Sequence, residues 1–157
     1  MKRLLLYLTA VAAMVIAAPV PGADKPPNLS GKWTLDKASS EFARGAPDSL
    51  TATITDDGKK IRMVQTMGGP EGDRITELDL DRGAETVNHM GEIEMRTKLR
   101  QDGAKLLEDT TFTGPRGTLT RKSVITLSED GRTLTLDAGY ESPDGSFREK
   151  IVLDKVD

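Results

Sequence analysis

The sequence predicts an all-β protein whose strands form an antiparallel up-and-down meander, closed into a β-barrel of about eight to ten strands with at most one short helix. Hydrophobicity alternates with a period of two from residue 29 onward. Asp-Gly pairs also separate alternating runs at four places, and Asp-Gly favours hairpin turns because glycine accepts positive φ. A long meander loses its exposed edges by closing, so we expect a barrel; a β-sandwich is the alternative.

The N-terminus has the three parts of a secretory signal. Lys2 and Arg3 precede an apolar run, Leu4 to Ala18, and a stretch of small residues ends at Ala23. The run is short for a membrane span, so cleavage is favoured over a retained anchor. We therefore expect export to the periplasm or the exterior, with no integral membrane span after cleavage.

This reading divides the chain into a signal peptide (1–23), an extended tether with two prolines (24–28) and a single barrel domain (29–157). The alternating runs of the domain cover 31–36, 50–55, 60–67, 91–100, 105 onward, 118–127, 133–140 and 147–153.

The runs differ in how clearly they show an inner and an outer face. In the first, Trp33 and Leu35 share one face; the clearest is 91–100, where apolar and charged residues alternate. The segment 37–43 is the one candidate for a helical turn, and Gly45 ends it quickly.

Composition excludes several kinds of chemistry. The chain has no cysteine and one histidine, His89, which excludes disulfides, cysteine nucleophiles, Ser-His pairs beyond His89 and multi-histidine metal sites. Losing Lys2 and Arg3 with the signal moves the net charge from −3 to −5. We therefore expect no metal, no cofactor and no nucleic-acid partner.

Several polar residues fall on positions that should face inward. They are Gln65, Glu108, Arg121, Ser123 and Glu149. A dry packed core does not accept such groups without partners. They either line a hydrated cavity and contact a ligand, or register shifts and barrel ends place them in water.

The opening of the domain, Leu29-Ser30-Gly31-Lys32-Trp33, resembles that of small exported bacterial lipocalin-like proteins, and its Gly-x-Trp matches the lipocalin motif. The stretch from Leu127 to Leu136 resembles the closing hairpin of the same group. The resemblance implies a calycin-type barrel in which Trp33 closes one end beneath an arginine, with Arg121 and Arg148 as alternatives. It also implies an apolar ligand.

The leading hypothesis is an exported, monomeric binder of a small apolar or amphipathic molecule, without catalysis. The expected ligand contacts are Met63, Gln65, Met95, Phe112, Arg121, Tyr140 and Phe147. Arg121 would suit a carboxylate or phosphate head group. The alternatives are an envelope interaction module with a filled barrel, and an enzyme that uses Glu108 or Glu149 as an acid or base.

Overall fold

The structure, a computed structural model, describes residues 25–157, so the predicted signal peptide lies outside the described residues. Ten strands account for most of this part of the chain. They are β1 (Gly31–Leu35), β2 (Ser49–Asp56), β3 (Lys60–Gly68), β4 (Arg74–Asp81), β5 (Thr86–Met90), β6 (Ile93–Asp102), β7 (Lys105–Gly114), β8 (Gly117–Leu127), β9 (Thr133–Ser142) and β10 (Gly145–Val156).

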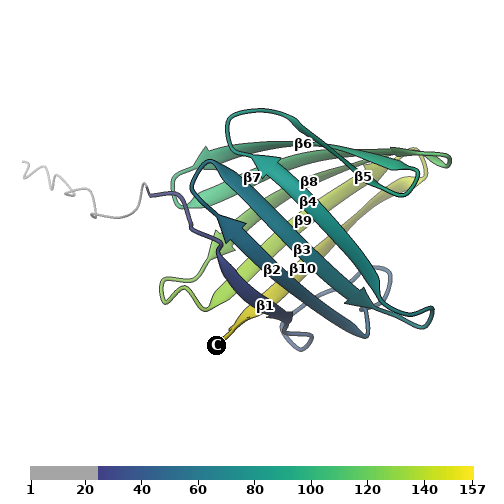
Figure 1. Cartoon of the computed structure of the whole chain (residues 1–157). Coiled ribbons are helices and arrows are strands. Elements are labelled where there is room, and N and C mark those ends of the chain that lie inside the picture. The colour runs from purple at the N-terminus through teal and green to yellow at the C-terminus, as the bar shows by residue number, and fades with distance from the viewer. Residues whose placement is uncertain (1–24) are drawn as a thin grey trace, which may run out of the picture.

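The strands form one antiparallel sheet in the order β4-β3-β2-β1-β10-β9-β8-β7-β6-β5. The first strand pairs with the last, and the sheet curls until β4 and β5 face each other (Figure 1). The predicted meander and barrel are therefore confirmed. No helix forms among residues 25–157, which agrees with the expected maximum of one, and so none there could cross a membrane.

The candidate helical segment instead continues the sheet. The backbone of Glu41 exchanges two hydrogen bonds with that of Lys150, with N···O distances of 2.7 and 2.9 Å. The Asp36 carboxylate accepts bonds from the backbone N–H groups of Ala38 and Ser39, which turns the chain just after β1. Segment 36–42 thus lies beside β10, where β1 has already ended.

The predicted Asp-Gly turns are confirmed: Gly58, Gly103 and Gly131 lie between consecutive strands, Gly145 begins β10, and all four have positive φ. Tight turns keep the register between neighbouring strands simple. Alternation therefore sorts side chains in or out: in β2 the inward Leu50, Ala52, Ile54 and Asp56 are buried, and the residues between them are exposed.

The barrel has one seam, between β4 and β5, which share no hydrogen-bonded ladder. The side chain of Asn88 spans it. Its Oδ1 accepts a bond from the backbone N–H of Asp79, and its Nδ2 donates to the backbone carbonyl of Asp79, both at 2.9 Å. One side chain thus takes the place of the missing backbone pair.

Candidate functional site

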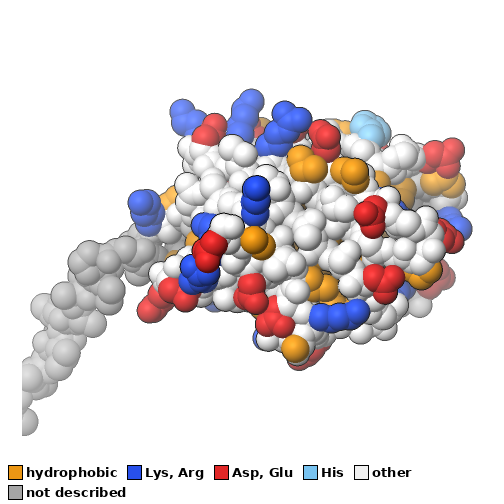
Figure 2. Space-filling view, turned by 60° about the horizontal axis from the view of Figure 1, so that its bottom comes forward, with side chains coloured by type: hydrophobic (Ala, Val, Ile, Leu, Met, Phe, Trp, Pro, Cys, Tyr) orange, Lys and Arg blue, Asp and Glu red, His pale blue; other side chains and the backbone are white. Residues whose placement is uncertain are grey.

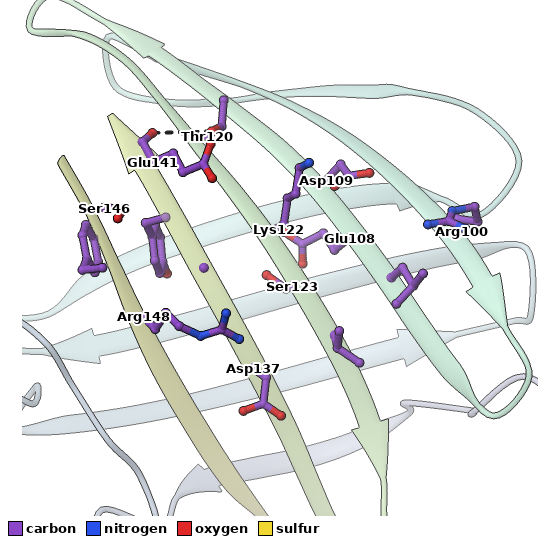
Figure 3. Close-up of a pocket in the computed structure, with 15 residues that line it drawn as sticks. Arg100, Glu108, Asp109, Thr120, Lys122, Ser123, Asp137, Glu141, Ser146 and Arg148 are labelled. Carbon is purple, nitrogen blue, oxygen red and sulfur yellow. Dashed lines mark hydrogen bonds between the residues drawn. The ribbon is translucent and has the colours of Figure 1, made fainter. Parts of the chain in front are cut away.

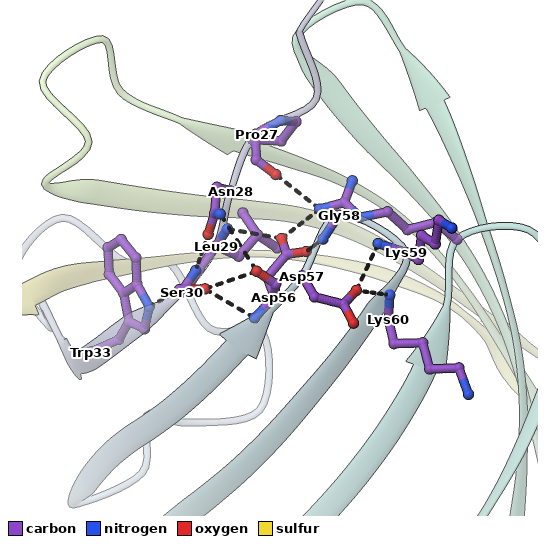
Figure 4. A network of polar contacts seen from close by, with 11 residues as sticks. Pro27, Asn28, Leu29, Ser30, Trp33, Asp56, Asp57, Gly58, Lys59 and Lys60 are labelled. Atoms are coloured by element: carbon purple, nitrogen blue, oxygen red, sulfur yellow. Dashed lines mark hydrogen bonds and ion pairs between the residues drawn. The ribbon is translucent and has the colours of Figure 1, made fainter.

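One end of the barrel is sealed by a buried carboxylate, Asp56, at the end of β2 (Figure 4). It accepts hydrogen bonds from the backbone N–H groups of Leu29 (3.0 Å) and Gly58 (2.9 Å), and it forms an ion pair with Arg82 at 2.6 Å. Arg82 also donates to the carbonyl of Pro27 at 2.8 Å. These bonds join three separate segments at what we call the closed end.

Trp33 lies at this closed end and is 1% exposed. Its indole N–H donates to the carbonyl of Leu29 at 3.0 Å. Neither arginine expected above it is there, because Arg121 lies in the interior and Arg148 lines a groove on the outer face. The cation over the ring is Lys155 of β10, with Nζ 5.4 Å from the ring centroid, because β10 is the strand paired with β1.

Above the closed end lies an interior cavity of about 260 Å³. Most of its wall is apolar, and its floor is formed by core residues such as Ile61, Leu106 and Leu134. Five of the seven predicted ligand-contact residues line it. They are Met63, Gln65, Met95, Phe112 and Arg121.

The cavity continues into a wider opening of about 820 Å³, which we call the mouth. The loop before β2 and the turn between β3 and β4 form its rim. The interior and the mouth share the residues Gln65, Met67, Arg74, Arg121 and Leu136, so the two spaces are continuous. The interior alone falls just short of ~300 Å³, the lower end for ligand sites, and the combined space exceeds it.

A polar cluster stands where the interior meets the mouth. Oε1 of Glu108 accepts bonds from Nε (3.1 Å) and Nη2 of Arg121 and from the hydroxyl of Thr110 (2.7 Å). The hydroxyls of Thr110 and Thr97 are 3.0 Å apart. Because Thr110 gives its single hydrogen to Glu108, Thr97 must be the donor to Thr110.

Aromatic rings hold the same arginine from the other side. The Arg121 guanidinium lies 5.3 Å from the ring centroid of Phe112, and Tyr140 is opposite Arg121 in the β8–β9 register. The rings of Tyr140 and Phe147 stack at 4.5 Å, and Arg44 lies 4.3 Å above Phe147. The result is a column beside the mouth in which two stacked rings lie between two cations.

This arrangement shifts two pKa values. Burial raises the pKa of Tyr140, and Arg121 offsets only part of that effect. For Arg121, burial alone would lower the pKa, but the charges of Glu108 and Tyr140 and the hydrogen bonds to them raise it. At neutral pH the site therefore presents a neutral phenol and a cationic guanidinium.

The two predicted residues outside the interior cavity are Tyr140, which lines the mouth, and Phe147, which lies behind it in the stack. Their contact with a ligand stays a prediction, as does that of the other five. The prediction omitted Glu108 as a contact, and it missed Thr110 and Arg74. Their inward positions in alternating strands were the available signal.

A second hollow, of about 570 Å³, lies on the outer face of β7 to β10 (Figure 3). Its outward side chains carry both signs of charge, with Lys122 and Arg148 beside Asp137. On the face shown in Figure 2, charged residues of both signs are likewise interspersed. No group of three His, Asp or Glu residues within 25–157 could hold a metal ion. The apolar interior is therefore the stronger candidate site.

Solved structures with the same fold include two proteins of Ramazzottius varieornatus. Secretory abundant heat soluble protein 4 has a TM-score of 0.57 and 15% identity, over 83% of this chain and 96% of that one. A second secretory abundant heat soluble protein has a TM-score of 0.56 and 14% identity, over 85% and 99% of the two chains.

A third similar structure is the zebrafish ileal bile acid-binding protein complexed with cholic acid. Its TM-score is 0.56 and its identity 19%, over 82% of this chain and 99% of that chain. No family model and no curated protein matches the sequence. These similarities confirm the calycin-type fold implied by the lipocalin-like motifs. The bacterial and exported nature of the protein stays a prediction.

Proposed function

We propose that the protein binds a small amphipathic molecule, with its apolar part inside the barrel and its polar head at the level of Glu108 and Arg121. The observation that carries this proposal is the apolar cavity, which is closed below by the Asp56 network and open to solvent at the mouth. Burying apolar surface contributes about 25 cal/mol per Å², so a hydrocarbon tail would supply most of the affinity.

The bile acid-binding structure adds support of a weaker kind, because its ligand is amphipathic and its barrel has the same fold. Binding without catalysis is part of the proposal. So is export, which rests on the signal-like pattern of residues 1–23. The competing interaction module expects a filled barrel, and the open interior favours the binder over it.

The test is native mass spectrometry of the protein purified gently from the envelope fraction of its own host. We expect one retained small molecule per chain. We also expect the mass of the protein to match a chain that begins near Asp24. A protein mass without any adduct, together with no thermal shift across a panel of lipids and fatty acids, would favour the interaction module instead.

A matched pair of variants links the adduct to the cavity. Thr76→Trp places an indole in the interior, since Thr76 lines the cavity, and we expect it to lower adduct occupancy at least about tenfold. Thr51→Trp makes the same change on the exposed outer face of β2 and should leave occupancy unchanged. Equal occupancy in both variants would place the ligand elsewhere.

A further inference from the structure

The positive charge of Arg121 is already matched inside the barrel. Its guanidinium binds Glu108 through two nitrogens; Glu108 is 6% exposed, and Arg121 is partly exposed where it lines the mouth. A second carboxylate arriving from a ligand would have to share this guanidinium with Glu108. Two carboxylates that share one site repel each other, so the second would be bound weakly.

Two polar groups beside this pair have no partner among residues 25–157. All three hydrogen bonds to the Glu108 carboxylate end on Oε1, so Oε2 is free to accept another. The hydroxyl of Ser123 is buried, lies opposite Glu108 in the β7–β8 register, and makes no hydrogen bond (Figure 3). Ser123 lines the outer hollow and neither the interior cavity nor the mouth, whereas Glu108 lines the interior, so the acceptor that a ligand in the barrel can reach is Oε2 of Glu108.

The charge of the mouth points the same way. The charged side chains that line it are Glu71, Asp73, Arg74, Arg121 and Glu149. Carboxylates therefore outnumber cations even before Glu108 is counted. Arg44 stacks on Phe147 next to the mouth. When Arg44 and Glu108 are both counted, the carboxylates still outnumber the cations. Such a mouth repels anions and attracts cations.

We propose that the ligand is an amphipath whose head group donates hydrogen bonds, as a hydroxyl or a protonated amine does, and that carboxylate-headed molecules bind poorly. The head would donate a hydrogen bond to Oε2 of Glu108, which lines the interior cavity. This inference rests on the proposed function, because it describes the polar end of the molecule held in the barrel.

The experiment compares three probes with one tail, dodecanol, dodecylamine and dodecanoate. Each is titrated by calorimetry into delipidated protein at a concentration below its solubility limit and below any micelle formation. We expect the alcohol and the amine to bind at least about tenfold more tightly than the carboxylate, because a buried hydrogen bond to a charged group discriminates strongly.

Variants then locate the preference. Glu108→Gln releases Arg121, and we expect dodecanoate to gain about tenfold while dodecylamine loses a similar factor. If burying an unpaired arginine prevents folding, the double variant Glu108→Gln/Arg121→Gln removes both charges together and should bring the three affinities within about threefold of each other. The control Glu129→Gln removes an exposed carboxylate in the turn between β8 and β9, away from the mouth, and should change the ratios less than about threefold.

The possible outcomes distinguish this inference from the proposed function on which it rests. Equal binding of all three probes by the natural protein would overturn the head-group inference and leave the cavity as the binding site. Tightest binding of dodecanoate would overturn it in favour of an anionic head at Arg121. Binding of none, with no thermal shift, would count against the proposed function and the inference together.

Discussion

At the scale of single residues, the polar groups inside the barrel form a chain of hydrogen bonds whose direction is set by which groups carry a hydrogen. Thr97 donates to Thr110, Thr110 donates to Glu108, and Glu108 neutralises Arg121. Each step follows from counting hydrogens on known atoms. The bonds to Glu108 all end on its Oε1, so Oε2 remains as an acceptor for a ligand.

Tyr140 offers a direct test of this environment, because it is the only tyrosine after Tyr7. Burial raises its pKa above the ordinary value of 10.0 in the folded protein. A group whose pKa is raised by folding contributes stability that is complete below its unfolded pKa and is lost as the pH rises through the folded pKa. We therefore expect that contribution to be lost above pH ~10.

The measurement is the ultraviolet absorbance of tyrosinate in a chain that starts at residue 25, titrated folded and in denaturant. The folded midpoint should lie above the unfolded one. Tyr140→Phe is the control: it should unfold with a shallower dependence on alkaline pH than the natural protein. A folded midpoint at or below the unfolded one would contradict the burial of this hydroxyl.

At the scale of elements, the seam between β4 and β5 is the weakest point of the sheet. Every other neighbouring pair is held by a backbone ladder, whereas this pair has the two bonds from Asn88 to Asp79. A weaker contact crosses the same seam, from the hydroxyl of Thr76 to the sulfur of Met90 at 3.6 Å. Local opening should therefore begin here.

We expect Asn88→Ala to speed amide hydrogen exchange in β4 and β5 by about tenfold or more, because the hydrogen bonds that Asn88 makes between these two strands are lost. Exchange in β8 and β9 should be unchanged. Exchange measured by mass spectrometry on peptides from each strand checks this. His89→Ala, one residue away on the outer face of β5, serves as the control. Unchanged exchange in β4 would mean that Asn88 does not hold the seam.

At the scale of the whole molecule, the two ends of the barrel differ in what fills them. The closed end has a core around Trp33 and Leu29 and a buried ion pair, Asp56 with Arg82. The mouth is lined by loops and exposed charges, and its polar cluster around Glu108 and Arg121 lies at the wall where the interior begins. The wide opening is therefore at the mouth, and the proposed ligand would enter there.

Breaking the closed-end network should destabilise the fold as a whole. Asp56→Asn leaves Arg82 buried without its counter-charge, and we expect it to lower the free energy of unfolding by about 3–5 kcal/mol. Chemical denaturation measures this. The adjacent Asp57 accepts two backbone bonds but is exposed, so Asp57→Asn should cost less. Equal losses in the two variants would contradict the importance of the buried pair.

Much of the fold was predictable because alternation and turn chemistry are local. The four Asp-Gly turns and the inward residues of β2 follow from neighbours in the sequence. The same alternation placed Gln65, Glu108 and Arg121 inside, and the structure puts all three on the cavity wall. Position along the chain therefore decided which side chains face inward.

Contacts between distant strands could not be predicted in this way. The cation over Trp33 and the ion pair of Asp56 with Arg82 each join residues that are far apart in the chain. Such contacts depend on how far each strand is staggered as the sheet closes, and no local pattern encodes that stagger. The sequence by itself determined an alternating meander with polar residues inside. Only the tertiary structure decided which of those residues neutralise one another and which remain open to a ligand.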